Sequence, residues 1–366
     1  MKIYNRQLEK IEDEGLQQRV SEIMRKVQNF LVQNYGLESQ TLEKRAQELS
    51  IVTFSKKDDQ TYIKTFDGKP KELPISTFHV AWHGQKSQRY DGDMCYFEDA
   101  IFIDATYTDD EFEHTFAHEF FHHLSSDSEM KFDENGHALY KTGVSIGSYD
   151  RNDNLVSRES IALTEGITEA LTIQYMEGRG LESYIVFNKI ATILMNRKHP
   201  KILEAYFSNN KNKVEEFYKD FEARQEIVSS EELKNLYYDA KGPNAYFPID
   251  KPINANLIRG CLEYSLSYCE NMEQLIAERR RLLPIFKSMA NDPNIEYSDE
   301  NFDIREMVNS VFNARRTMLT AKKNTQALGK ETIIEQKDTA FIDETEQAIE
   351  NEQKAIENSK DNTQSL

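Results

Sequence analysis

The chain has 366 residues, a hydrophobic content of 39% and a formal net charge of −18 at pH 7. Its length permits one large or two modest domains with a sizeable core, and its acidic balance argues against a nucleic-acid-binding surface. No apolar run reaches membrane length and no signal-like stretch stands at the start, which predicts a cytoplasmic protein without membrane segments. The cysteines, three in number and without CxxC spacing, predict neither a disulfide framework nor a thiolate zinc site.

The N-terminal residues predict a helix. Apolar residues recur at helical spacing from Leu16 to Leu31, and Gly36 is placed to end that helix. Residues 1–48 are therefore expected to form an N-terminal helical segment.

Residues 50–104 predict mixed strands and turns. Residues 77–83 alternate with period two, so that His79 and His83 share one face of a strand, which is expected to be a polar sheet face. Residues 100–104, with the sequence AIFID, predict a short buried strand that leads into the next helix.

That helix carries the motif HExxH. Thr108 is suited to cap its N-terminus, and three phenylalanines at a spacing of four would pack it against a core: Phe112, Phe116 and Phe120. His118 and His122 lie on one helical face, where two imidazoles can bind one metal ion, and Glu119 stands beside them to transfer protons. The alternative interpretation is that these histidines are ordinary polar residues of an amphipathic helix.

A catalytic zinc site takes three protein ligands and keeps a fourth position for water, so a third ligand must lie elsewhere. His123 points about 100° away from the ligand face. His114 lies on an extension of that face, but a fourth protein ligand would close the site. Ser125 and Ser128 occupy the positions where a metzincin would carry its glycine and third histidine. The third ligand is therefore expected further along the chain.

A β-hairpin is expected next. Residues 138–146 and residues from 155 onward predict strands, and the cluster of turn-forming residues at 150–154 lies between them. This hairpin would separate the HExxH helix from the helix that follows.

The helix predicted over residues 163–172 offers two carboxylates one turn apart. Glu165 and Glu169 share a face with Thr168 and Thr172, whereas the opposite face is apolar. This segment is the best source of the missing ligand. The alternative is a solvated acidic helix face.

At these residues the chain resembles the gluzincins, the thermolysin-like branch of HExxH zinc peptidases. In that family a glutamate on a second helix is the third ligand, and an acid four residues later hydrogen-bonds a ligand histidine. By position, the resemblance implies that Glu165 binds zinc with the two histidines and that Glu169 orients one of them, which a ligating imidazole requires. The run TEGITE is also similar to the NEGxxE-like segments of related aminopeptidases. Thr164 replaces the usual asparagine and Glu169 the usual aspartate, and the resemblance covers about residues 95–180.

The resemblance implies a zinc-dependent peptidase that binds one Zn²⁺ per chain and acts on peptides or proteins. Zinc would lower the pKa of its bound water to about 7 and polarise the substrate carbonyl. Glu119 would be the general base, taking the proton of the water and delivering it to the leaving amine. The tetrahedral oxyanion needs a further donor, for which the candidates nearby in sequence are Tyr149, His137 and Tyr175.

The remaining residues predict helices and then a tail. Helical patterns cover residues 184–195, 214–224, 231–240, 255–281 and 304–323. The tail is expected to be disordered because residues 331–366 have ten acidic residues, three lysines and few large apolar residues. The expected fold class is α+β, a small mixed sheet with an HExxH active-site helix followed by a mostly α-helical C-terminal region. Beyond the N-terminal segment, the expected regions are a zincin-like catalytic core over 49–180, a helical domain forming the second wall of the cleft over 181–328, and the acidic tail over 329–366.

Three functions are compatible with these patterns. The first is a zinc-dependent endopeptidase or aminopeptidase. The second is a helical interaction protein whose zinc site is structural or vestigial. The third is a regulatory metallopeptidase that cleaves one specific partner, for which the chain shows no helix-turn-helix that would target DNA.

Overall fold

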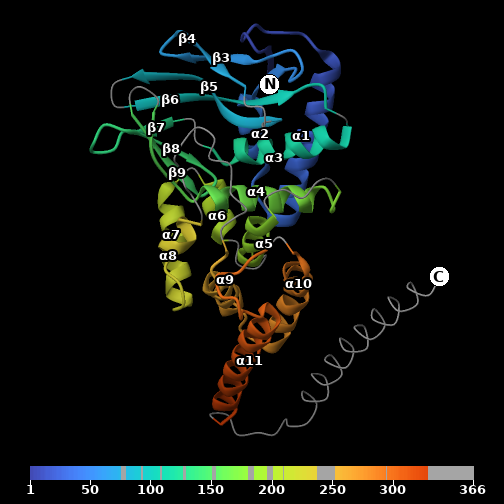
Figure 1. Cartoon of the computed structure of the whole chain (residues 1–366), viewed down its shortest axis with the longest axis vertical. Coiled ribbons are helices and arrows are strands. Elements are labelled where there is room, and N and C mark those ends of the chain that lie inside the picture. The colour runs from blue at the N-terminus through green and yellow to red at the C-terminus, as the bar shows by residue number, and fades with distance from the viewer. Residues whose placement is uncertain are drawn as a thin grey trace, which may run out of the picture. The chain divides into compact units, whose positions relative to one another are not determined.

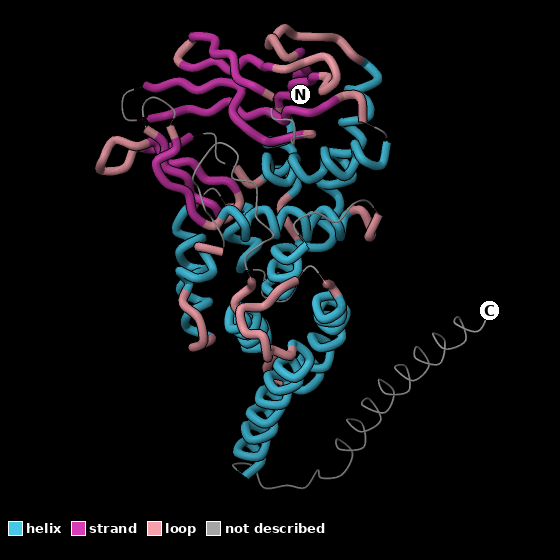
Figure 2. Tube along the Cα trace, viewed as in Figure 1, coloured by secondary structure: helices cyan, strands magenta, loops and turns pink. Residues whose placement is uncertain are grey.

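The strands described all lie before residue 160, where three helices are interspersed among them, and only helices follow. Figure 2 shows the strands and helices of the computed structural model. The structure describes residues 1–75, 80–91, 94–107, 109–126, 129–150, 154–179, 185–195, 201–208, 210–236, 252–293 and 295–328. The expectation of a mixed α and β fold is confirmed. None of the helices described is both long and apolar enough to span a lipid bilayer.

Seven of the strands described form one mixed sheet (Figure 1). Its order is β1-β2-β6-β5-β3-β4, and β7 pairs with the end of β6. Residues 2–5, expected within a helical segment, instead form β1 and pair in parallel with β2. The strands are β1 (Lys2–Asn5), β2 (Ser50–Phe54), β3 (Thr61–Phe66), β4 (Lys69–Pro74), β5 (Ala81–Asp91), β6 (Met94–Asp104) and β7 (Glu129–Lys131).

The centre of this sheet is β6, which pairs in parallel with β2 and antiparallel with β5. The apolar run predicted at 100–104 is the C-terminal end of β6, and its first four residues are buried. On one face, Trp82 of β5 stacks on Phe102 with the ring centroids 4.8 Å apart. The next residue of β5, His83, takes the opposite face by the period of the strand. His79 of the predicted alternation lies outside the described residues.

Helices α1 (Glu14–Tyr35), α2 (Ser39–Glu48) and α3 (Asp109–Leu124) lie on one side of this sheet (Figure 1). The predicted end of α1 is confirmed, because Gly36 adopts a left-handed conformation at its C-cap. Phe30 of α1 meets Phe121 of α3 with the ring centroids 6.3 Å apart. Helix α3 carries the HExxH sequence in its second half and packs against β5 and β6. Thr108, its predicted cap, lies outside the described residues.

A second sheet replaces the expected hairpin. It has three antiparallel strands, in the order β10-β9-β8: β8 (Ala138–Thr142), β9 (Ser145–Tyr149) and β10 (Leu155–Glu159). Gly143, with φ of 61°, turns the chain inside the segment that was predicted as one strand. A side chain at this position would also approach Thr164 Cγ2 to 2.6 Å. The prediction of a single strand over 138–146 is therefore wrong.

The later elements are helical, as predicted, but their boundaries differ. They are α4 (Ile161–Tyr175), α5 (Ile185–Leu194), α6 (Lys201–Phe207), α7 (Lys211–Arg224), α8 (Ser230–Lys234), α9 (Ala255–Ser267), α10 (Met272–Asn291) and α11 (Ile304–Leu328). The single helix predicted over 255–281 is broken because Asn271 adopts an extended conformation and caps a new helix, accepting a hydrogen bond from Gln274 N. Helix α6 was not predicted. Residues 237–251, which include part of a predicted helix, lie outside the described residues.

The chain forms two compact units, residues 1–315 and residues 316–366. The boundaries expected after residues 48 and 180 both fall inside the first unit, and the division itself falls within α11. The acidic tail, 329–366, lies outside the described residues.

Candidate metal centre

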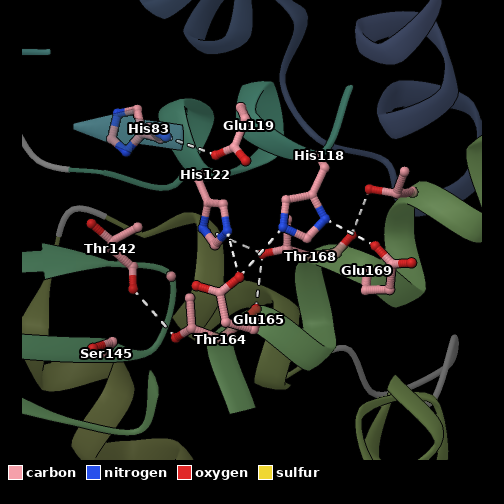
Figure 3. A network of polar contacts seen from close by, with 12 residues as sticks. His83, His118, Glu119, His122, Thr142, Ser145, Thr164, Glu165, Thr168 and Glu169 are labelled. Atoms are coloured by element: carbon pink, nitrogen blue, oxygen red, sulfur yellow. Dashed lines mark hydrogen bonds and ion pairs between the residues drawn. The ribbon is translucent and has the colours of Figure 1, made fainter. Parts of the chain in front are cut away.

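Aromatic packing determines which face of α3 points away from the sheet. Phe112, Phe116 and Phe120 are fully buried, and consecutive rings in this row stack with centroids 6.0 Å apart. Because a helix repeats every 3.6 residues, this row directs His118 and His122 toward α4 (Figure 3). The two histidines are 7% and 6% exposed.

The two histidines meet Glu165 of α4 (Figure 3). Glu165 Oε2 lies 3.4 Å from His118 Nε2 and 3.1 Å from His122 Nε2. These three residues, called the first cluster below, form one of two groups of possible metal ligands among the described residues. Neither Glu165 nor Glu169 lies on a solvated face, because the Glu165 side chain is 16% exposed and Glu169 is fully buried.

The opposite nitrogen of each imidazole has an oxygen partner. His118 Nδ1 lies 2.9 Å from Glu169 Oε2, and His122 Nδ1 lies 3.4 Å from Thr168 Oγ1. The Thr168 hydroxyl donates to the carbonyl of Thr164, one turn earlier, at 2.8 Å. A hydroxyl has one proton and two lone pairs, so it is then an acceptor toward His122. Both Nδ1 atoms therefore carry protons, so each Nε2 is the nitrogen that would bind a metal ion.

Thr168 has a further partner that the sequence did not indicate. The Tyr206 hydroxyl of α6 lies 2.6 Å from Thr168 Oγ1. Tyr206 is fully buried, and burial raises the pKa of its hydroxyl above the usual range, so the phenol is protonated and donates. Tyr206 supports the orientation of His122 through Thr168. No sequence signal could have found it, because α6 itself was not predicted.

The side chains of the first cluster shift the pKa values of one another. Burial by itself would lower the pKa of His118, but hydrogen bonds to Glu165 and Glu169 outweigh it and raise the pKa to about 10. Burial would likewise raise the pKa of Glu165, but the neighbouring His122 and His118 hold it well below its usual range. His118 and Glu165 thus favour opposite charges in a buried position.

Glu119 lies beside the first cluster without belonging to it (Figure 3). Its Oε2 accepts a hydrogen bond of 2.7 Å from the backbone N–H of His83 in β5. Its other oxygen has no hydrogen-bond partner among the described residues. The carboxylate is therefore held next to the predicted metal ligands with one oxygen available.

Close packing fixes α4 against its neighbours. A Cβ atom on Gly166 would come within 2.4 Å of the backbone oxygen of Phe187 in α5, so only glycine permits this approach. On the other side, Thr164 Oγ1 accepts from Val144 N at 3.2 Å and lies 3.4 Å from the Thr142 carbonyl. Thr164, which stands where the gluzincins usually have asparagine, thus holds α4 to the β8–β9 turn.

The predicted oxyanion donors lie in other surroundings. His137 Nδ1 is 3.4 Å from Asp133 Oδ2, in the loop before β8. Tyr149 packs on a cluster that includes Phe97. The Tyr175 hydroxyl donates to Glu113 Oε1 at 2.6 Å. The role of Tyr149 or His137 as a donor stays a prediction.

The sequence also did not indicate a second cluster, formed by His83, Asp99 and His123. His123 points away from the first cluster, as its position on the helix predicts, but it meets His83 with the ring centroids 5.7 Å apart. Burial and the neighbouring His83 lower the pKa of His123 to about 4, so this imidazole is neutral at pH 7.

No protein-family model, no curated protein and no solved structure matches this chain.

Proposed function

We propose that this protein is a zinc-dependent peptidase of the gluzincin type, with peptides or proteins as substrates. One observation carries the proposal. Two imidazole Nε2 atoms on α3 and one carboxylate oxygen on α4 converge, and the carboxylate of Glu119 stands next to them without joining them. Three protein ligands with one position left over is the arrangement typical of catalytic zinc sites.

The donor atoms suit zinc in kind. Imidazole nitrogen and carboxylate oxygen are both zinc ligands. The rings of His118 and His122 already direct Nε2 toward Glu165, so neither ring would have to rotate to bind the metal. Glu169 and Thr168 accept the protons of the opposite nitrogens, which is the support that ligating histidines usually have. His118, His122 and Glu165 would therefore hold one Zn²⁺ per chain.

Zinc supplies the Lewis acid that polarises a substrate carbonyl and acidifies water at neutral pH. The role of Glu119 is then to take a proton from the attacking water and to pass it to the departing amine. The hydrogen bond from His83 N keeps Oε2 fixed, so Oε1 is the oxygen that would receive the proton. Glu119 follows His118 directly in sequence but is not one of the three ligands. It can therefore act as a base and not as a ligand.

The variant Glu119→Gln tests the proposal. Glutamine keeps an oxygen that can accept from His83 N but cannot take a proton. We expect the purified variant to bind zinc like the natural protein and to lose at least about 100-fold in peptide hydrolysis, which is the low end of what general base catalysis contributes. The readouts are zinc content by elemental analysis and cleavage of a mixed peptide library by mass spectrometry.

Glu111→Gln is the matched control, because Glu111 is exposed two turns earlier on the same helix. It should keep both zinc and activity. Hydrolysis that persists in Glu119→Gln at the level of this control would contradict the mechanism, and a zinc-loaded natural protein that cleaves no peptide in the library would contradict the function.

The depth of the first cluster favours a second candidate, a structural zinc site in an interaction protein. His118, His122 and the Glu165 side chain are each at most 16% exposed. A structural site predicts that removal of zinc unfolds the protein, because metal binding is then part of the folding free energy. Thermal unfolding with and without chelator, measured beside hydrolysis, separates the two functions.

A further inference from the structure

The three residues of the second cluster, which lies next to Glu119, come from three different elements. His83 comes from β5, Asp99 from β6 and His123 from α3. The possible ligand atoms of these residues all lie within 4.8 Å of one another, as do those of the first cluster. The His83 and Asp99 side chains are 4% and 7% exposed, and His123 is 7% exposed. Three polar side chains are thus enclosed in one place.

The Nδ1 atom of His123 directs an unprotonated lone pair into the second cluster. Its Nε2 lies 3.0 Å from the backbone oxygen of Arg45, and a carbonyl oxygen can only accept. The imidazole proton is therefore on Nε2, and Nδ1 is left with its lone pair. His123 Nδ1 is buried and has no hydrogen-bond partner. A backbone carbonyl that fixes the tautomer in this way is a usual support of a metal-binding histidine.

His83 Nε2 is the second buried nitrogen without a hydrogen bond. It lies 3.3 Å from Asp99 Oδ2, but the contact lacks the alignment of a hydrogen bond. An unsatisfied buried polar atom is costly, and native proteins rarely leave two of them beside one carboxylate. A cation placed between the three atoms would satisfy both nitrogens and the carboxylate at once.

The carboxylate of Asp99 is oriented by a tyrosine hydroxyl. The Tyr140 hydroxyl of β8 lies 3.3 Å from each carboxylate oxygen of Asp99. Burial strongly raises the pKa of Tyr140, so this hydroxyl keeps its proton and donates. The second cluster therefore has both parts of a metal site. Three possible ligand atoms face one another, and neighbouring groups hydrogen-bond to the ligand residues and orient them.

We propose that His83, Asp99 and His123 bind a second divalent metal ion, zinc by the preference of two imidazoles and a carboxylate. The site would tie β5 and β6 to α3. The backbone N–H of His83 also holds Glu119, and His123 follows Glu119 by one turn of α3, so the same ion would fix the position of that carboxylate. The proposal concerns metal content and does not depend on peptidase activity.

Metal stoichiometry of the full chain tests this inference. The purified protein, dialysed against about 1 μM free Zn²⁺, should contain two zinc ions per chain by elemental analysis. Asp99→Asn and His123→Gln should each contain one, and so should the double variant His118→Ala, His122→Ala. Combining Asp99→Asn with that double variant should leave none. Asp133→Asn is the matched control, because its carboxylate also faces a histidine, His137, at 3.4 Å but outside both clusters; it should keep two.

A measurement on the natural sequence covers the case in which a variant does not fold. Titration of the metal-free protein with Co²⁺ should show two equivalents with visible absorption bands of imidazole and carboxylate coordination. In the His118→Ala, His122→Ala variant, added Zn²⁺ should still raise the temperature of unfolding.

Each alternative result overturns the inference. A single Co²⁺ equivalent that persists in Asp99→Asn and is lost in the His118→Ala, His122→Ala variant would show that the second cluster binds no metal. A second zinc ion that survives both Asp99→Asn and His123→Gln would lie elsewhere. Failure of the peptidase proposal is recognised separately, because it would appear as two bound ions without hydrolysis.

Discussion

Glu169 Oε2 lies 2.9 Å from His118 Nδ1, on the side of the imidazole ring opposite to the nitrogen that faces Glu165. The same carboxylate is fully buried, and its other oxygen lies 3.6 Å from His114 Nε2. One buried acid on α4 therefore serves two histidines one turn apart on α3. Only one of them, His118, belongs to the first cluster.

Glu169→Gln should weaken zinc binding at the first cluster by about 10- to 100-fold, the usual loss when the partner of a ligating histidine is changed. Glutamine is similar in size, but the negative charge that favours Nδ1–H on His118 is lost. Competition with a chromophoric chelator measures the affinity. Glu113→Gln removes one charge from α3 at a position bonded to Tyr175 and should leave the affinity unchanged. Equal affinities in the two variants would argue against the role of Glu169.

Thr168→Val should also weaken zinc binding, but by less than Glu169→Gln, since a neutral hydroxyl at 3.4 Å from His122 Nδ1 is the weaker acceptor. Thr172→Val is the matched control, because Thr172 is equally buried on the same helix and its hydroxyl donates to the Thr168 carbonyl at 2.8 Å. Zinc titration of both variants by calorimetry checks the difference. The prediction fails if the two valine variants bind zinc alike.

Gly166→Ala should destabilise the protein by about 1–3 kcal/mol, the usual cost of overpacking. The added Cβ would stand 2.4 Å from Phe187 O, and a backbone atom cannot swing aside. Urea unfolding of the metal-free protein measures the free energy without the contribution of bound metal. At Gly15 a Cβ would meet only Asp13 Oδ1, at 3.6 Å, so Gly15→Ala should change the free energy of unfolding by no more than about 1 kcal/mol. A neutral or stabilising effect of Gly166→Ala would show that α4 and α5 can separate.

Asp220→Asn should lower the free energy of unfolding by about 1–3 kcal/mol at pH 7, because Asp220 of α7 accepts hydrogen bonds from charged and phenolic donors in three helices. The donors are Lys201 at 3.0 Å, Arg224 at 3.0 Å, Tyr264 at 3.1 Å and Tyr268. Glu216→Gln removes an exposed carboxylate from the same helix and should cost no more than about 1 kcal/mol.

The effect at Asp220 should depend on pH with a defined sign. Burial would raise the pKa of this carboxyl, but bonds from Tyr268, Lys201 and Arg224 lower it below its ordinary value of 3.8. Its stabilisation is therefore complete above pH 3.8 and is lost as the pH falls through the lowered pKa. Urea unfolding between pH 3 and pH 8 should show a difference between natural protein and variant that is constant at higher pH and shrinks in acid. A difference that grows in acid would contradict this assignment.

Local periodicity was enough to predict much of the candidate centre. The positions of His118, Glu119 and His122 on one helix, and of Glu165 and Glu169 one turn apart on another, follow from the 3.6-residue repeat of the α-helix. The end of α1 at Gly36 and the apolar end of β6 follow from equally local signals. Boundaries were missed where a single residue changes the backbone, as at Gly143 and Asn271.

The sequence by itself determined which side chains stand on each face of α3 and α4, because a helix sets those directions over a few residues. Only the tertiary structure decided which faces meet. It brought Glu165 to the two histidines across 43 and 47 residues of chain, placed Tyr206 behind Thr168, and turned His123 toward His83 and Asp99. These contacts depend on how helices and sheet pack, and the packing sums many weak interactions between segments far apart in sequence. A periodic pattern carries no record of such pairings.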